Sequence, residues 1–388
     1  MAQALFLSTS VVTVSTITLV GSELSPSDNL ISLPYALVTV GTALSTIPVS
    51  FLMRRFGRRA IFLCALVIAL LGFASGFGAL YWGAFGLLMV SGLFHGMAQA
   101  ATQYFRFAAV EVVSENRAGS AISWVLGGGI IAALFAPGAA RLANQTFSDI
   151  PYSGSYIMML LVGSVALLPI LFLRVPKPAL DENSGSGRPL REILSKPKTS
   201  AAMVAAGTGW LLMVMLMGAA PLAMHAKGFH FDHSSQVIQW HMLGMYVPSF
   251  FSAFLVGRLG ITRLLLLGGV ILFSSAAVGY TGESFYHFVA SLILLGIGWN
   301  FMFVGGTTLL TQTYSLEEKA KVQGLNEFLI FAMATTGAVL AGVLVKTIGW
   351  QSLMVGAMVA VGVAISLVMT LSLRYRSHEK AEAAAKSL

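Results

Sequence analysis

Twelve apolar segments, each close to twenty residues long, constrain this chain more than any other feature. A helix needs about 20 mostly apolar residues to cross the hydrocarbon core of a bilayer. Strands of a membrane β-barrel are shorter and alternate in polarity, and these segments do not alternate. The sequence therefore predicts an all-α membrane protein with twelve transmembrane helices. The segments are 3–21, 30–53, 60–78, 83–108, 119–141, 154–174, 200–223, 234–257, 262–281, 285–310, 322–345 and 351–373.

The composition agrees with a membrane protein and argues against a soluble one. Hydrophobic residues make up 56% of the 388 residues and charged residues 10%, against about 25% charged in soluble domains. The net charge of +8 does not predict nucleic-acid binding, because the basic residues lie between apolar segments and form no polar face. The single cysteine, Cys64, excludes an intrachain disulfide and is expected to be a buried thiol. Segment 4–21 has no basic residues before it, so we expect a retained span and no signal peptide.

The distribution of Lys and Arg predicts the orientation. If the N-terminus is cytoplasmic and the spans alternate, 20 of the 23 basic residues fall on the cytoplasmic side and 3 on the other. Cytoplasmic loops carry the excess of positive charge in membrane proteins. The sequence therefore predicts a multi-pass protein of the cell (cytoplasmic or inner) membrane with both termini in the cytoplasm.

The chain divides into two halves that resemble each other weakly. Arg55-Phe56-Gly57 after the second segment matches Arg258-Leu259-Gly260 after the eighth, 203 residues later. Such internal repeats are common in transporters. We therefore predict two pseudo-symmetric six-helix bundles joined by a polar linker. The predicted parts are an N-terminal bundle 1–174, a linker 175–199, a C-terminal bundle 200–375 and a cytoplasmic tail 376–388.

The loop between the second and third segments carries a family motif. It reads SFLMRRFGRR over residues 50–59, and its R-x-G-R-R end is similar to the pattern G-x-L-x-D-R-x-G-R-R of the major facilitator superfamily. Arg54 stands where that family usually has an acid. The resemblance covers the whole chain and implies a secondary transporter, or permease, that works by alternating access. It identifies no subfamily, because the fourth segment lacks the family's usual arginine and has Gly92-Leu93-Phe94-His95-Gly96.

In the resembling family this loop also latches the halves on the cytoplasmic side. Since Arg54 replaces the acid, we predict that it pairs with Glu327 in the eleventh segment, while Arg55 or Arg58 pairs with Glu111. The alternative is that the arginines only face lipid phosphates. The predicted latch residues are Arg54, Arg55, Gly57, Arg58, Arg59, Glu111 and Glu327.

The family fold would place the first, fourth, seventh and tenth segments around a central cavity. Polar groups are costly in lipid and usually face the bundle interior. His95 and Gln99 lie on one helical stripe of the fourth segment. The predicted wall is rich in hydroxyls, amides and aromatic rings and poor in charge, which favours a neutral or zwitterionic organic solute. The predicted substrate-binding residues are Thr13, Tyr35, His95, Gln99, Trp210, Gln239, Tyr246, Trp299 and Asn300.

Two alternatives to a carrier of organic solutes stay open. The loop MHAKGFHFDHSSQ (224–236) contains His225, His230, Asp232 and His233, which could belong to a carrier of a metal or metal chelate. A non-transporting sensor or scaffold with a transporter fold is the other. The sequence predicts no catalytic residue, bound metal, cofactor or nucleic-acid partner, and hence no enzyme. The expected partners are a small-molecule substrate and the lipid bilayer, with a proton or substrate gradient as the energy source, and the expected state is a monomer.

Overall fold

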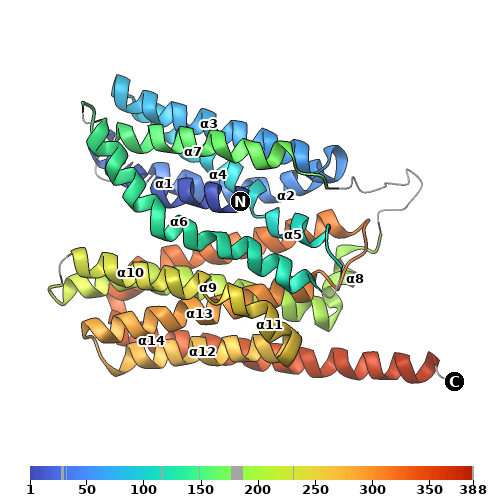
Figure 1. The fold of residues 1–388 in the computed structure, drawn as a ribbon. Helices are drawn as coiled ribbons and strands as arrows, with labels where there is room; N and C mark the ends of the chain where they lie inside the picture. Colours follow the sequence, from blue (N-terminus) through green and yellow to red (C-terminus); the bar gives the residue numbers. More distant parts are fainter. Residues whose placement is uncertain are drawn as a thin grey trace. The chain divides into compact units, whose positions relative to one another are not determined.

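The computed structural model describes residues 1–27, 30–31, 33–114, 117–147, 149–175, 187–229 and 231–386. These residues form fourteen helices and no strand (Figure 1). The helices are α1 (Ala2–Leu24), α2 (Leu33–Phe56), α3 (Arg58–Trp82), α4 (Phe85–Thr102), α5 (Phe105–Val110), α6 (Ala118–Thr146), α7 (Ser153–Leu171), α8 (Leu190–Ser195), α9 (Pro197–Ala226), α10 (Phe231–Tyr246), α11 (Ser249–Leu259), α12 (Ile261–Thr281), α13 (Phe285–Leu310) and α14 (Lys319–Lys386).

The fourteen helices correspond to the twelve predicted spans. The fourth span comprises α4 and α5, the eighth comprises α10 and α11, and the short α8 lies in the predicted linker. Helix α14 contains two spans, because Gly349 has φ 79° and ψ 170° and turns the chain between them. Within the described residues, nine helical stretches are long and apolar enough to cross a membrane by themselves. The predicted all-α fold of twelve transmembrane helices is confirmed.

The chain forms two compact units. The first contains Met1–Glu115, Trp124–Leu180 and the short segment Gln323–Phe328 of α14; the second contains Asn116–Ser123, Asp181–Val322 and Leu329–Leu388. The predicted bundle boundaries at 174, 199 and 375 stay a prediction. Part of the predicted linker (176–186), the side chains of the predicted tail and the last two residues lie outside the described part of the chain.

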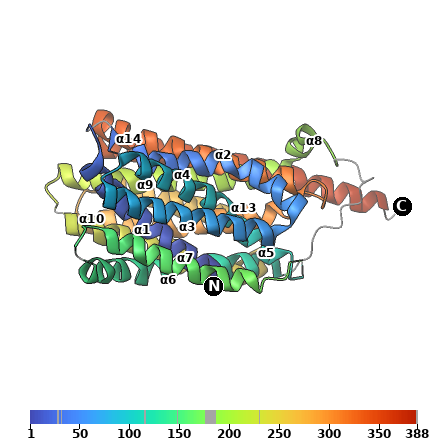
Figure 2. The same ribbon diagram turned by 90° about the horizontal axis from the view of Figure 1, so that it is seen from above.

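In the first unit, α4 is a central helix. It packs against α1, α2 and α3, and α3 also packs against α7 (Figure 2). Glycine allows the closest of these approaches. A Cβ added at Gly96 of α4 would lie 2.2 Å from the carbonyl oxygen of Val38 on α2, so a larger residue would force the two helices apart. Close approach at small residues is the usual way helices associate in membranes.

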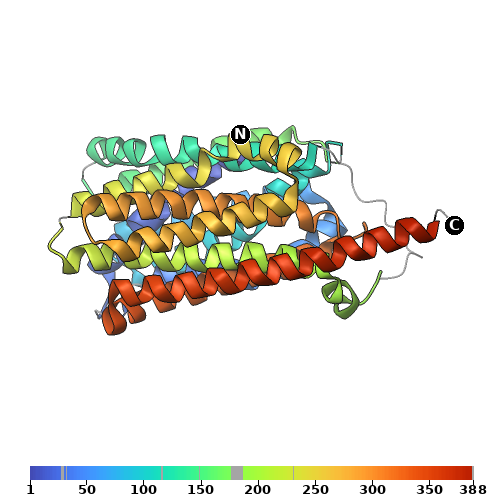
Figure 3. The same cartoon turned by 90° about the horizontal axis from the view of Figure 1, so that it is seen from below.

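In the second unit, α13 has the corresponding place. It packs against α9, α10 and α12. A Cβ at Gly296 would lie 2.6 Å from the carbonyl oxygen of His241 and from the backbone nitrogen of Met245, both on α10. After its turn, α14 runs as a long helix to Lys386 (Figure 3).

Gly57 in the first unit and Gly260 in the second have the same backbone conformation. Gly57 has φ 84° and ψ 158°, and Gly260 has φ 78° and ψ 158°. These values fall in a region that is essentially restricted to glycine. The match that suggested two repeats in the sequence thus marks the same backbone turn in both units.

Cys64 differs from its expectation. It is exposed on α3, so the prediction of a buried thiol is wrong. Its neighbour Phe62 is fully buried, which shows that Cys64 lies on the opposite, outward face of the helix. An apolar run does not distinguish these faces, because in a membrane both can be apolar.

Candidate functional site

The motif loop of the first unit contains a buried ion pair. Arg58 begins α3, and its side chain is 6% exposed. Its Nε donates a hydrogen bond of 2.7 Å to Oε1 of Glu111, and its Nη2 donates to the same oxygen. Of the two predicted partners for Glu111, Arg58 is therefore the one that the structure shows. Nη2 also donates to Oε1 of Gln323 at 3.0 Å, which connects the pair to the α14 segment of this unit.

A second, deeper ion pair lies beside the first. Arg106 of α5 donates from Nη2 to Oε1 of Glu327, and the two side chains are 2% and 1% exposed. The same oxygen accepts a 2.8 Å hydrogen bond from Nδ2 of Asn326. The guanidinium of Arg106 is held in turn by the backbone oxygen of Gln103, at 2.9 Å from Nη1.

The predicted pairing of Arg54 with Glu327 is therefore wrong. Arg106 extends from within the bundle and takes the place expected for Arg54, which is half-buried at the end of α2. Arg55 and Arg59 are exposed. The hydrogen bonds from Asn326 and to Gln103 offset part of the cost of burying this charge pair. The sequence offered a signal for it, because both charges lie inside or beside apolar segments.

His95 occupies an aromatic box in the first unit. It is 1% exposed and stacks on Phe6 of α1, with ring centroids 5.5 Å apart and planes 5° apart. Phe73 of α3 lies at the same centroid distance on a tilted plane. Nδ1 of His95 has no hydrogen-bond partner. This histidine thus lies between α1, α3 and α4, inside the bundle of its own unit.

Two other predicted substrate residues of the first unit are on the helices that pack around α4. Thr13 of α1 donates its hydroxyl to the backbone oxygen of Thr9 at 2.9 Å and contacts the sulfur of Met159 at 3.2 Å. Tyr35 of α2 and Gln99 of α4 are half-buried. Within the described residues, none of these three side chains forms a hydrogen bond with His95.

An aromatic cluster forms the centre of the second unit. Trp210 of α9 makes edge contacts with Trp299 and Phe303 of α13, with centroids 5.5 and 5.7 Å away. Trp299 stacks on Phe303 at 5.0 Å with planes 20° apart, and Phe331 of α14 lies 5.7 Å from Trp210. The indole nitrogens of both tryptophans are buried without a hydrogen-bond partner. Sequence reasoning found the tryptophans but missed Phe303 and Phe331, because contacts between α9, α13 and α14 are not visible as a local pattern.

Asn300 has a different environment from its neighbour Trp299. Its Nδ2 donates to the backbone oxygen of Met245 at 2.7 Å and to Oγ of Ser249 at 2.6 Å, and its Oδ1 accepts from Oγ of Ser252 at 2.7 Å. Pro248 interrupts the helix here, since it has no N–H and its ring clashes with the preceding turn. The amide of Asn300 satisfies the carbonyl that the break between α10 and α11 releases.

The remaining predicted substrate residues are on α10. Tyr246 is half-buried at its end and Gln239 is exposed. The predicted metal alternative has no support in the described residues, which contain no group of three or more His, Cys, Asp or Glu that could hold an ion. His230 lies outside the described residues, as does the side chain of Asp232.

The comparisons with known proteins define the class of this protein. The model of the Major Facilitator Superfamily matches residues 1–238 and 209–387, so the chain belongs to this family of membrane transporters and is not an enzyme. It is a multi-pass membrane protein that transports a small solute.

The chain is 37% identical to the riboflavin transporter RfnT of Brucella anthropi over 355 residues, which are 91% of this chain and 89% of that protein. It is 26% identical to the uncharacterized transporter YdeG of Bacillus subtilis over 345 residues, 84% of this chain and 80% of that one. Among solved structures, the transporter FucP in its outward conformation gives a TM-score of 0.77 at 12% identity, covering 95% of this chain and 97% of FucP. A bacterial homologue of the iron transporter ferroportin gives 0.74 at 16% identity, with 96% and 97% covered. These two likenesses concern the fold alone.

Proposed function

We propose that this transporter moves a flat, aromatic, uncharged solute of the riboflavin type across the cytoplasmic membrane by alternating access. The observation that carries this proposal is the cluster of Trp210, Trp299 and Phe303, with its two indole N–H groups lacking partners. The 37% identity to the riboflavin transporter RfnT points to the same chemistry.

The cluster fits such a solute physically. An aromatic ring stacks on or against other rings with a gain of about 0.5–1.5 kcal/mol per pair beyond the area it buries. A buried donor without a partner costs about 1–3 kcal/mol, and a bound solute removes that cost if it offers an acceptor. Riboflavin has both features, because its flat ring system carries carbonyl oxygens along one edge. Trp299 and Trp210 are then the residues expected to recognise the ring.

The first unit also offers neutral polar side chains of a kind that suits hydroxyl groups. Riboflavin carries a chain of hydroxyl groups on its ring. Thr13, Gln99 and Tyr35 are neutral hydrogen-bonding side chains on α1, α4 and α2. We propose that they contribute to solute binding, together with Tyr246 and Gln239, whereas Asn300 supports the site by holding the break between α10 and α11.

The ion pairs Arg58–Glu111 and Arg106–Glu327 form the proposed latch. Residues Gln323–Phe328 of α14 belong to the first unit while the rest of α14 belongs to the second. Arg58 and Arg106 both bind this segment, through Gln323 and Glu327. We propose that these contacts form in one state of the transport cycle and break in the other, driven by a proton or substrate gradient.

The experiment is uptake of labelled riboflavin by a bacterial riboflavin auxotroph that expresses this chain. Uptake above the empty-vector level, competed by unlabelled riboflavin, supports the proposal. Trp299→Phe keeps a ring and removes the N–H, and Trp240→Phe is the matched control, because Trp240 is 50% exposed on α10. No uptake by a correctly inserted protein, and none in the reverse direction from loaded vesicles, would contradict riboflavin as the substrate.

We further propose the orientation and organisation that the sequence predicts: both termini in the cytoplasm, a linker over 175–199, and a monomer. Single-cysteine labelling in a Cys64→Ala background tests the orientation. A cysteine at Gly187 should react with an impermeant reagent only after the cells are opened. Labelling of that residue from outside intact cells contradicts the proposed orientation.

A further inference from the structure

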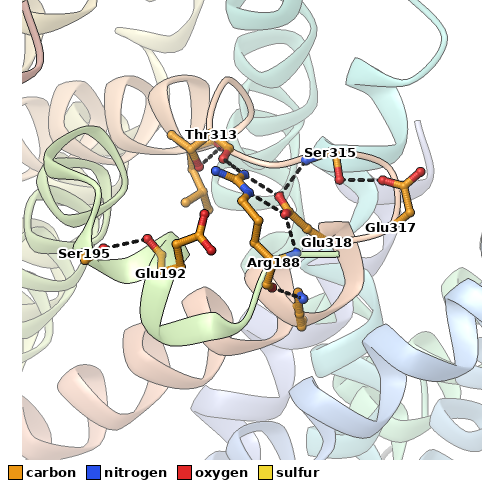
Figure 4. A network of polar contacts seen from close by, with 9 residues as sticks. Arg188, Glu192, Ser195, Thr313, Ser315, Glu317 and Glu318 are labelled. Atoms are coloured by element: carbon orange, nitrogen blue, oxygen red, sulfur yellow. Dashed lines mark hydrogen bonds and ion pairs between the residues drawn. The ribbon is translucent and has the colours of Figure 1, made fainter. Parts of the chain in front are cut away.

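Arg188, in the proposed linker, is bound to the loop between α13 and α14 by several hydrogen bonds. Its Nε donates to Oε1 of Glu318 at 2.6 Å, and its Nη2 donates to Oε2 at 2.5 Å (Figure 4). Its backbone N–H donates to the same Oε1 at 2.9 Å, and Nη2 also donates to the backbone oxygen of Thr313 at 3.2 Å. A two-point contact between a guanidinium and a carboxylate is strong and fixes the geometry of both groups.

The acidic partner of this contact is buried and fully bonded. The side chain of Glu318 is 2% exposed, and that of Arg188 is 29% exposed. Oε2 of Glu318 also accepts a 3.0 Å hydrogen bond from the backbone N–H of Ser315, so both carboxylate oxygens have two donors. An ion pair taken out of water is favourable only with such additional hydrogen bonds. The contact is therefore a defined junction between two segments of the second unit.

The linker side of the junction is attached at two further points. Gly187 has φ 61°, and a Cβ added there would lie 2.6 Å from Cγ of Glu318. The backbone before Arg188 thus lies directly against the carboxylate side chain. Five residues after Arg188, Ile193 of α8 is fully buried, and α8 packs against α9.

The other side of the junction is the start of α14. Glu318 immediately precedes this helix, and its backbone oxygen accepts a 3.0 Å hydrogen bond from the N–H of Val322 in the first turn. Nζ of Lys321 donates to the backbone oxygen of Arg188. We call Arg188, Glu318 and Lys321 the linker clasp, because together they bind the linker to the first turn of α14.

The latch residues follow the linker clasp on the same helix. Gln323 accepts a hydrogen bond from Arg58, and Glu327 accepts one from Arg106. Helix α14 is continuous from its start until Gly349 turns the chain. At a rise of 1.5 Å per residue, Gln323 and Glu327 lie only about 3 and 9 Å along the axis from Lys321. A displacement of the first turn therefore also displaces the latch residues.

We propose that Arg188 is a positioning residue for the transport cycle: the linker clasp holds the start of α14 in the orientation in which the latch closes. It thereby sets how readily the latch opens. This role rests on the proposed function, because the latch is part of that function. If the linker clasp only attaches the linker to the second unit, its loss affects the linker and leaves residues 323–328 unchanged.

The test is hydrogen–deuterium exchange of the purified full-length protein in detergent, read by mass spectrometry of its peptides. Backbone amides in a buried helix exchange when the structure opens locally. The exchange rate of residues 323–328 therefore reports on the latch without any solute. Arg106→Met breaks the latch directly and gives the rate that corresponds to an open latch.

Arg188→Met removes the side-chain donors of the linker clasp. We expect it to raise the exchange rate of residues 323–328 about tenfold, since hydrogen bonds to a charged group are lost. Arg191→Met is the matched control, because Arg191 is exposed in the same short segment. It should exchange at the wild-type rate.

Gly187→Ala retains every donor and acceptor of the linker clasp. It forces a methyl group against Glu318, and we expect exchange of residues 323–328 to rise about fivefold. Gly228→Ala is its matched control, because Gly228 also has a positive φ, 82°, but a Cβ there meets nothing within 4 Å. It should leave residues 323–328 at the wild-type rate.

Faster exchange of residues 323–328 in both variants, with α12 (Ile261–Thr281) at its wild-type rate, supports the proposal. Faster exchange confined to residues 187–195 overturns it, because the linker clasp then only attaches the linker. An equal rise in residues 323–328 and in α12 also overturns it, because it shows a general loss of stability.

Uptake of labelled riboflavin measures the consequence for transport. Arg188→Met should lower the maximal rate about threefold or more relative to Arg191→Met, with a smaller change in KM, because Arg188 acts on a conformational step. An unchanged maximal rate contradicts a role in the cycle. If the wild type itself takes up no riboflavin, the proposed function fails, whereas the exchange rates still decide whether the linker clasp positions the latch.

Discussion

Helices α4 and α13 have the same place in the two repeats but present different chemistry. Gly96 lies against the backbone of α2 in the first unit, and Gly296 lies against the backbone of α10 in the second. Around these glycines, α4 carries His95 and Gln99 and leads into Arg106, whereas α13 carries Trp299 and Phe303. The repeat thus retains the packing of the fold while the side chains differ: the first unit buries the charge of Arg106, and the second buries the stacked rings of Trp299 and Phe303.

The buried charge of the first unit gives the largest expected effect. Arg106→Met leaves Glu327 charged and unpaired at 1% exposure, which should destabilise the protein by about 3–5 kcal/mol. The double variant Arg106→Met/Glu327→Met removes both charges and should regain most of that loss. Melting temperatures of the purified proteins measure both effects.

Arg117→Met is the matched control, because Arg117 is exposed. The role of the pair is contradicted if Arg106→Met is as stable as this control, or if the double variant is no more stable than Arg106→Met. Loss of transport in a double variant that is as stable as the wild type supports the latch rather than a purely structural role.

The shared packing is tested by the equivalent glycines. Gly96→Ala and Gly296→Ala each place a Cβ within 2.2 or 2.6 Å of backbone atoms, and overpacking of this kind costs about 1–3 kcal/mol. We expect both variants to melt at lower temperatures, by similar amounts. Gly86→Ala and Gly356→Ala are the controls, since a Cβ there meets nothing within 4 Å. A lower melting temperature for only one of these two variants would show that the two repeats pack differently.

The pair Arg188–Glu318 of the second unit gives a pH-dependent effect. The hydrogen bond from Arg188 is the main cause that lowers the pKa of Glu318 from 4.5 to about 2. The native state therefore favours the ionised carboxylate, and this stabilisation is complete above about pH 4.5 and disappears as the pH falls toward 2. Glu318→Gln should cost about 1–2 kcal/mol at neutral pH.

Melting temperatures of the wild type and Glu318→Gln, measured between pH 7 and the lowest pH at which both stay folded, check this prediction. The difference should be constant down to about pH 4.5 and then shrink. Glu317→Gln, on the same loop, should show a much smaller difference, because Glu317 is half-buried and bonded to the hydroxyl of Ser315. A pH-independent difference for Glu318→Gln would contradict the ion pair as its origin.

The smallest effect concerns the aromatic cluster. Trp299→Phe keeps the stack on Phe303 but removes the indole N–H, so we expect the KM for riboflavin to rise about fivefold with little change in melting temperature. Gln99→Ala in α4 should raise the KM by a similar or smaller factor. If Trp299→Phe has the wild-type KM while Gln99→Ala does not, recognition of the ring belongs to the first unit and not to the second.

The sequence was sufficient for the features that depend on local composition. Span length follows from the thickness of the hydrocarbon core, and twelve apolar segments therefore predicted the fold class. Gly57 and Gly260 also indicated the repeat from the sequence, because a backbone with φ near 80° admits glycine and little else. For Glu111 the sequence left two partners open, Arg55 and Arg58. Only the structure showed that Arg58, at the start of α3, is the one that pairs with it.

Partners across the bundle required the tertiary structure. The sequence paired Glu327 with Arg54, whereas the tertiary structure pairs it with Arg106 of α5. Asn300 was recognisable as a polar group in a span. Only the packing of α13 against α10 showed that its amide binds the backbone at the break near Pro248.

What the sequence determined by itself is thus the number of spans, their apolar character and the position of the turning glycines, because the bilayer and the backbone act on each residue locally. The tertiary structure alone decided which charges pair, which rings stack and which hydroxyls lack a partner. These depend on side chains more than a hundred positions apart, such as Arg106 and Glu327, meeting where water is excluded. Hydrogen bonds and ion pairs are directional and short-ranged, so their partners follow from the packed geometry and not from the pattern of the chain.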